Sequence, residues 1–231
     1  MKNLVVLMLS IVLLLSCSVK EKKSAVGNIH DSGQRGRTAL HVSMIEGDNR
    51  FIELINKGAD INAKDKEGDT PLQYAIRFGR IDAFRLLLEK GADINSKNNS
   101  DTTPLSMALQ AKQKEMAEIL LQKGASVNIA NAAGVTPLML ASSGHRHSDP
   151  DLVKLIISKG ADINAKDSTG RTALFYAAGK AWPDITMMLL EAGSDPAVKD
   201  HNGKNISALL NGEGFKENRE KIKIMISRRK R

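Results

Sequence analysis

The sequence is poor in cysteine and in aromatic residues. Cys17 is the single cysteine among 231 residues, so the chain cannot form an intramolecular disulfide. Phenylalanine, tryptophan and tyrosine together make up 3% of the chain, whereas hydrophobic residues of all kinds make up 42%. This composition favours a core of many small, similar contacts between helices over a core built around large aromatic side chains.

The sequence also lacks the patterns on which common catalytic sites are built. It has no nucleophile elbow, no phosphate-binding glycine loop and no zinc-protease helix motif. Its carboxylates mostly recur at equivalent positions, with Asp60, Asp93 and Asp162 in one set and Asp65, Asp167 and Asp200 in another. Such repetition indicates a structural role, because catalysis requires one cluster unlike the others. We therefore predict that the chain is not an enzyme and uses no cofactor.

A basic face of the kind that binds nucleic acid is missing as well. The formal net charge is +8, but it is concentrated at the two ends of the chain. Residues 36–215 hold 21 basic and 22 acidic residues and are therefore close to neutral. A nucleic-acid-binding domain usually carries its positive charge on the folded body, so we expect no nucleic-acid partner.

The first 16 residues have the layout of a signal peptide. Lys2 gives a short positive start, and residues 4–15 are apolar except for Ser10. Twelve residues are too few to span a bilayer, which takes roughly 20. The segment 14–17, Leu-Leu-Ser-Cys, then resembles the lipobox of bacterial lipoproteins, although Leu15 is larger than the residue usual at its position.

That resemblance implies cleavage before Cys17 and acylation of the cysteine. Ser18 replaces the aspartate that typically retains such lipoproteins in the inner membrane. The resemblance therefore implies a lipid-anchored protein of the bacterial cell envelope, in the outer membrane and facing the periplasm. Residues 17–35 are polar after the cysteine, without apolar periodicity, and are expected to form a flexible tether.

The rest of the chain is a repeat. Gly-Ala-Asp-Ile-Asn occurs at 58–62, 91–95 and 160–164, with Gly-Ala-Ser-Val-Asn at 124–128. Thr-Pro-Leu occurs at 70–72, 103–105 and 136–138, and its threonines are 33 residues apart. Threonine followed by proline favours the start of a helix, and the glycine of the other motif favours a helix end.

These motifs and their 33-residue period resemble those of the ankyrin-repeat family. The resemblance implies an all-α solenoid of stacked helix pairs joined by extended, hairpin-like fingers. It covers an ankyrin-repeat domain at 36–231, with repeats at about 36–64, 65–97, 98–130, 131–166 and 167–199 and a partial capping repeat at 200–231. In the basic tail, Ile222, Met225 and Ile226 share one helical face, which predicts a cap on the stack, or else adhesion to anionic lipid headgroups.

In the ankyrin family the partner binds the finger tips and the exposed face of the first helix of each repeat. Carried onto this chain, these positions predict contact with an unidentified protein partner through Lys66, Glu67, Asp69, Phe78, Asn99, Thr102, Ala132, Ala133, Val135, Ser168, Arg171 and Trp182. The tip formed by Ala132, Ala133 and Val135 is apolar between polar tips, as expected for the dry centre of an interface. Phe78 and Trp182 share an alternative role, which is packing against the adjacent repeat, and Trp182 favours it because tryptophan is usually buried.

Two other functions stay open at this stage. The turn in repeat four has three extra residues and contains His145, His147, Asp149 and Asp151, side chains that could hold a divalent metal ion in a metal-sequestering lipoprotein. The simpler interpretation is that Ser148 or Asp149 caps a helix that Pro150 begins. The chain could also be a secreted effector that binds a host protein, in which case the mature form lacks the lipid.

Overall fold

The computed structural model describes residues 35–144, 149–210 and 215–228. Cys17, the signal segment and most of the tether lie outside the described residues, as do His145 and His147. Within the described ranges the chain forms eleven α-helices and a short 3-10 turn, and no strand. The all-α prediction is therefore confirmed.

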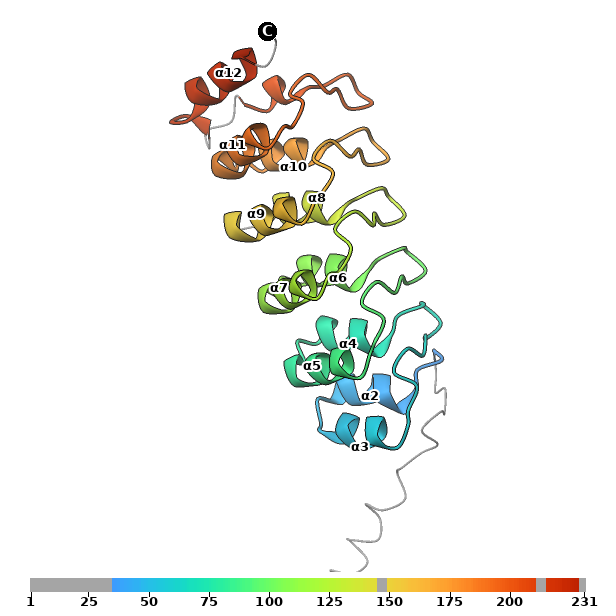
Figure 1. Cartoon of the computed structure of the whole chain (residues 1–231). Coiled ribbons are helices and arrows are strands. Elements are labelled where there is room, and N and C mark those ends of the chain that lie inside the picture. Colours follow the sequence, from blue (N-terminus) through green and yellow to red (C-terminus); the bar gives the residue numbers. More distant parts are fainter. Residues whose placement is uncertain (1–34, 145–148, 211–214, 229–231) are drawn as a thin grey trace, which may run out of the picture.

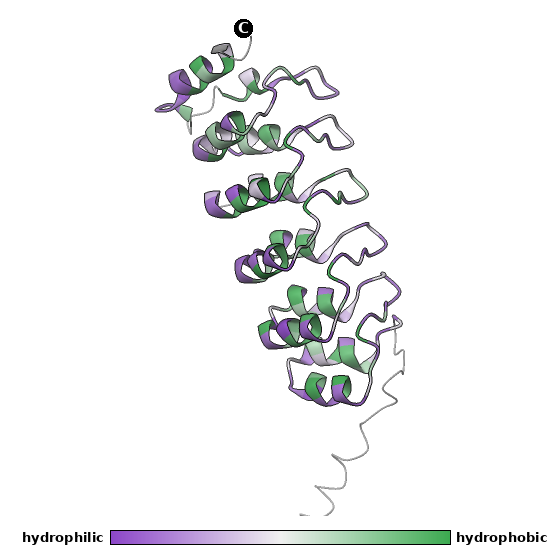
Figure 2. Cartoon of the chain, in the orientation of Figure 1, coloured by the Kyte–Doolittle hydropathy of each residue, from purple (hydrophilic) through white to green (hydrophobic). Residues whose placement is uncertain are grey.

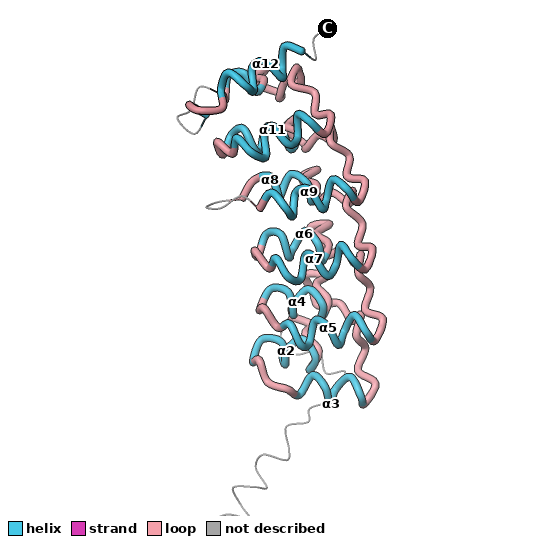
Figure 3. The backbone as a smooth tube through the Cα atoms, turned by 60° about the vertical axis from the view of Figure 1, so that its left-hand side comes forward, coloured by secondary structure: helices cyan, strands magenta, loops and turns pink. Residues whose placement is uncertain are grey.

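The helices come in antiparallel pairs that stack along one axis (Figure 1). The pairs are α2 (Ala39–Glu46) with α3 (Arg50–Asn56), α4 (Pro71–Arg77) with α5 (Ile81–Glu89), α6 (Pro104–Gln110) with α7 (Lys114–Gln122), α8 (Pro137–Ser142) with α9 (Pro150–Ser158), and α10 (Ala173–Gly179) with α11 (Pro183–Glu191). A 3-10 turn, η2 (Ile206–Ala208), and the helix α12 (Arg219–Arg228) follow. Figure 3 shows the same stack from a second side, with loops joining each pair to the next.

The helix boundaries follow from the repeated motifs. The hydroxyl of Thr70 accepts a hydrogen bond from the backbone N–H of Gln73 at the start of α4, and Pro71 occupies the first turn, where its missing N–H costs nothing. Thr103 and Thr136 cap α6 and α8 in the same way. After α5, Gly91 adopts a left-handed conformation with φ of 87°, which confirms the predicted helix end.

The core runs through the stack as one continuous cluster. Leu40, Leu72, Leu105, Leu138 and Leu174 occupy the same position of successive first helices, and each is at most 1% exposed. Phe84, Leu120, Val153, Ile156 and Leu189 are buried residues of successive second helices in the same cluster. Hydrophobic residues accordingly lie mainly on the helices, whereas the fingers are mostly hydrophilic (Figure 2).

The fingers are the extended loops at residues 63–69, 96–102, 129–135, 165–171 and 198–204, which all project to one side of the stack (Figure 1). One backbone hydrogen bond of 2.9–3.0 Å joins each finger to the preceding loop; for example, the N–H of Asn99 donates to the carbonyl of Glu67. Side-chain bridges add to this ladder. The carbonyl oxygens of Asn62, Asn95, Asn128 and Asn164 each accept a backbone N–H from the next repeat, at 2.8–2.9 Å.

The C-terminal unit closes the stack differently. η2 takes the place of a full first helix, and α12 packs against α11. Ile222 and Ile226 are buried and Met225 is half-buried, so the apolar face of the tail covers the last repeat. This supports the capping role. None of the helices described here combines the length and the apolar character needed to cross a membrane.

Candidate functional site

The finger tips are the most variable surface of the repeats, and a side-chain clamp at each finger fixes their backbone. One oxygen of Asp65 accepts the N–H groups of Glu67 and Asp69, at 3.0 and 2.8 Å. Asn98, Asn131, Asp167 and Asp200 hold the other four fingers through the same pair of hydrogen bonds. The repeated carboxylates therefore have a structural role. These hydrogen bonds fix the backbone of every finger, so the side chains that point outward can differ without a change of fold.

Most of the predicted binding residues do lie on this surface. The two central residues of each of four successive tips are exposed, and they are Lys66 and Glu67, Asn99 and Ser100, Ala132 and Ala133, and Ser168 and Thr169. Arg171 is exposed too, but its Nε lies 3.7 Å from a carboxylate oxygen of Asp200 in the following finger. It is thus part of an ion pair and not an isolated cation at the edge of the surface.

Three predicted contacts need correction. Asp69 is 2% exposed and Thr102 is 8% exposed, so neither can meet a partner directly. Both occupy the last finger position before the helix cap, and in these two fingers the side chain is buried against the stack. Val135 occupies the same position and is half-buried against the core, which leaves Ala132 and Ala133 as the exposed apolar part of the central tip.

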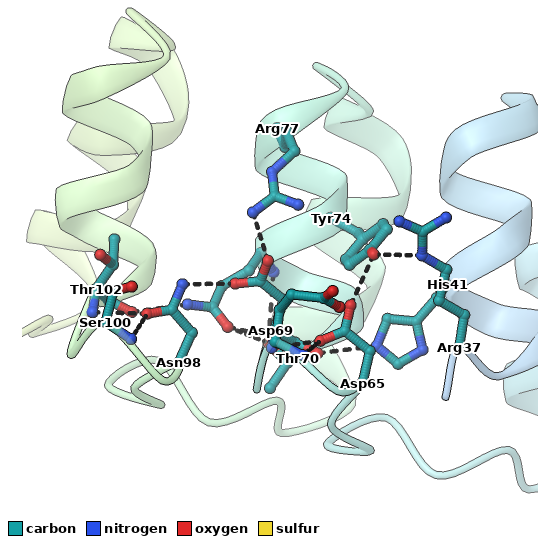
Figure 4. A network of polar contacts seen from close by, with 12 residues as sticks. Arg37, His41, Asp65, Asp69, Thr70, Tyr74, Arg77, Asn98, Ser100 and Thr102 are labelled. Atoms are coloured by element: carbon teal, nitrogen blue, oxygen red, sulfur yellow. Dashed lines mark hydrogen bonds and ion pairs between the residues drawn. The ribbon is translucent and has the colours of Figure 1, made fainter. Parts of the chain in front are cut away.

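Asp69 belongs to a polar network that joins the first three repeats (Figure 4). Its carboxylate pairs with Arg77 and accepts the side-chain amide of Asn98 at 2.8 Å. The other half of the network centres on Tyr74, whose hydroxyl donates to Asp65 at 2.7 Å and accepts from Arg37 at 2.7 Å. The network orders the bases of the fingers, and its polar groups are used internally.

Burial and these hydrogen bonds shift the titration of two of its members. Burial lowers the pKa of His41 below its ordinary value of 6.5, outweighing the hydrogen bond to the Asp69 carbonyl and the nearby carboxylates, which raise it. Burial and the hydrogen bond to Asp65 raise the pKa of Tyr74 to about 12. Both groups are therefore neutral near pH 7, as suits structural residues and not proton-transfer catalysts.

The same tyrosine–aspartate pair recurs in repeat five. The Tyr176 hydroxyl donates to Asp167 at 2.7 Å, and burial with this bond raises the pKa of Tyr176 to about 12. Burial alone would raise the pKa of Asp167, but hydrogen bonds from Arg171, Thr169 and Tyr176 leave it lower than usual. This recurrence indicates a common device for fixing a finger on its helix.

The two large aromatic side chains predicted at the binding surface differ in exposure. Phe78 is 40% exposed at the end of α4, with its ring centroid 6.0 Å from that of Tyr74. Trp182 is half-buried against the core, and its ring N–H donates to the Gly144 carbonyl at 3.0 Å. Phe78 can therefore contact a partner, whereas Trp182 joins repeats four and five, as the packing alternative requires.

The described part of the long turn in repeat four fits the simpler interpretation. Asp149 caps α9 by accepting the N–H of Leu152 at 3.1 Å, and its carboxylate lies 2.7 Å from the Lys114 ammonium. These contacts leave the pKa of Asp149 lowered, although burial opposes that shift. Among the described residues no group of three or more histidine, cysteine or acidic side chains is arranged to hold a metal ion. His145 and His147 fall outside those residues.

Lys204 is a surface residue that was not among those predicted from the sequence. It is exposed at the base of the last finger, in the position that Asp69, Thr102, Val135 and Arg171 hold in the earlier fingers. Alignment of the repeats would have indicated it, because the residue at this finger position changes from acidic to basic along the stack. The weak match of the sixth repeat to the motif hid it.

Comparisons with known proteins agree with the geometry. The family model described as "Ankyrin repeats (3 copies)" matches residues 8–98, 95–167 and 146–213. Protein phosphatase 1 regulatory subunit 12A of Mus musculus and that of Rattus norvegicus are each 41% identical over 64 residues. The similar segment covers 26% of this chain and 6% of either relative, so the likeness is confined to a small part of those proteins.

Proposed function

This chain belongs to the ankyrin-repeat family, whose stacked repeats serve as protein-binding scaffolds, and we propose that it binds its protein partner through the exposed finger tips. The observation that carries the proposal is the contrast within each finger. The clamp residues are buried or half-buried and hold the finger backbone, whereas the two tip residues face solvent and differ from repeat to repeat. Such a surface can change its partner without a change of fold.

The centre of the contact is proposed to be Ala132 and Ala133. Both are exposed on the middle finger, with the polar tips of Asn99 and Ser100 before them and of Ser168 and Thr169 after them. Small apolar side chains in the middle of a polar row let a partner approach closely and exclude water. Phe78, exposed at a helix end, adds an aromatic contact on the side of repeat two.

We further propose that the chain acts as a non-enzymatic lipoprotein anchored at Cys17 in the bacterial envelope. The support is the lipobox-like segment 14–17 and the polar residues that separate it from the first helix. The likeness to the phosphatase regulatory subunit covers 6% of that protein, so it names no partner for this chain.

A comparison of variants in a pull-down tests the central contact. Purified Ala133→Lys protein is incubated with a detergent extract of the source organism's cell envelope, and captured proteins are quantified by mass spectrometry. We expect loss of the partner that wild-type protein captures, because burying an unpaired ammonium costs several kcal/mol. Ala192→Lys is the matched control, since Ala192 is exposed at the end of α11, away from the fingers.

Lys66→Ala serves as a variant at the edge of the contact. It should change the salt dependence of capture more than the amount of partner captured, because exposed charges mainly steer association. Equal capture by wild-type, Ala133→Lys and Ala192→Lys proteins, with all three folded, would show that the central finger is not the contact.

A further inference from the structure

A hollow of about 330 Å³ opens between repeat five and the C-terminal unit. Phe175 and Tyr176 of α10 form part of its wall, and Leu209 closes the other side. Phe175 is 4% exposed, while Tyr176 and Leu209 are half-buried and offer apolar surface to the opening. A single aromatic or branched aliphatic side chain is a suitable occupant for a hollow of this size and lining.

The hollow exists because the sixth unit has no full first helix. In the preceding repeats, consecutive first helices pack directly on each other, α8 on α10 for example. After α10 the chain forms only η2, a turn of three residues. The C-terminal half of α10 is therefore left without the helix that covers its counterparts.

Positive charge surrounds this apolar surface. Arg171 and Lys204 stand at the bases of two adjacent fingers, and Lys180 follows the end of α10. Asp200 also borders the hollow, but one of its oxygens accepts the N–H groups of Asn202 and Lys204, and the other faces Arg171. Among the residues that the structure describes, the Lys204 ammonium has no carboxylate partner.

We propose that this hollow binds an acidic peptide segment of the partner protein. An apolar side chain of the segment enters between Tyr176 and Leu209, and a flanking carboxylate pairs with Lys204. The charge complementarity selects this occupant, since cations at the border of the pocket attract an acidic segment and repel a basic one. The proposal rests on the proposed function of the fingers and extends it to the C-terminal end of the same surface.

The probe is a synthetic nonapeptide labelled with fluorescein, with eight glutamates around a central phenylalanine, and binding to the full chain is followed by fluorescence anisotropy. Lys204→Glu should weaken binding at least about tenfold, because it replaces an attraction by a repulsion. Lys66→Glu is the matched control, with the same charge change on a distant, exposed fingertip. It should change the affinity less than about twofold. A peptide with alanine in place of phenylalanine should also bind at least about tenfold more weakly.

In the peptide assay, three results would overturn the proposal. They are absence of saturable binding up to about 1 mM peptide, an equal effect of Lys204→Glu and Lys66→Glu, and equal binding of the phenylalanine and alanine peptides. The last two outcomes indicate general attraction between opposite charges. If Ala133→Lys abolishes capture of the partner while Lys204→Glu retains it, the fingers bind and the hollow does not. If neither change matters, both proposals fail.

Discussion

An exchange between two equivalent buried residues tests how the repeats are coupled. Gln73 of α4 and Met139 of α8 occupy the same position of their repeats, and each is at most 1% exposed. The Gln73 side chain donates to the Thr102 carbonyl of the next repeat at 2.8 Å and accepts the N–H of Thr70 at 2.9 Å. Met139 offers only its sulfur to the equivalent N–H of Thr136, at 3.4 Å, and donates to nothing.

Gln73→Met keeps the side-chain size and removes the link between repeats. Loss of one hydrogen bond costs about 0.5–1.5 kcal/mol net. The methionine sulfur is also a weaker acceptor for the N–H of Thr70, which adds roughly a few tenths of a kcal/mol. The Thr102 carbonyl still accepts the N–H of Asn98 at 3.2 Å, so it is not left without a hydrogen bond. We therefore expect the unfolding free energy to fall by about 1–2 kcal/mol, which lowers Tm by about 2–8 °C for a chain of this size.

Met139→Gln should act in the opposite direction. A glutamine amide there can reach the Arg171 carbonyl, the equivalent of the Thr102 carbonyl, and stabilise the chain by about 0.5–1.5 kcal/mol. Urea unfolding is followed by circular dichroism and by the fluorescence of Trp182, the only tryptophan, which reports on repeat five. Unchanged stability of Gln73→Met together with destabilisation by Met139→Gln would refute the reasoning, since packing alone would then decide the preference at both positions.

Four further predictions follow from single residues. Gly91→Val should lower the unfolding free energy by more than about 1 kcal/mol, since φ is 87° while no atom lies within 4 Å of an added Cβ. Gly91→Asn should cost less, and equal unfolding midpoints of the two variants would contradict the argument. Ala181→Gly should raise the unfolding free energy by up to about 1 kcal/mol, because Ala181 holds φ at 56°. The unfolded chain binds a proton at His41 more readily than the folded one, because burial lowers the pKa of this residue in the folded state. Stability should therefore fall as the pH drops below about 6.5. His41→Gln should reduce this loss when urea midpoints at about pH 7 and pH 5 are compared. Cys17→Ala should abolish acylation and move the protein from the detergent phase to the aqueous phase in a phase-partition assay, and persistence in the detergent phase would exclude Cys17 as the anchor.

Much of the fold could be predicted because each helix boundary has a local chemical cause. The threonine cap at Thr70 and the left-handed glycine at Gly91 act within a few residues of themselves, so their positions in the sequence were enough. Lys112 and Ala181 also adopt positive φ, although neither residue type favours it. Only their alignment with Gly47 and Gly79, at the same position of the first two repeats, indicates this conformation.

The candidate surface was less predictable than the fold. The tip residues Ala132 and Ala133 are exposed as expected, because a hairpin tip has nothing to pack against. Asp69 and Thr102, each two residues after the second tip residue of its finger, are buried, and Asp69 is held by a contact with the next repeat. The hollow beside Lys204 depends on the shortness of η2, which the sequence around Asn205 does not reveal.

The asparagine bridges determine where this array can be lengthened. Each bridge joins an asparagine to an N–H 31 to 34 residues later, so a duplicated 33-residue segment inserted among repeats two to four carries its own bridge and completes the one before it. Ala197 stands at the fifth such position, and its methyl group cannot accept a hydrogen bond. A repeat inserted after this point would join the array without a bridge unless Ala197 were changed to asparagine. The array therefore extends readily from within and poorly at its C-terminal end, a useful asymmetry for anyone who wants to lengthen the binding surface.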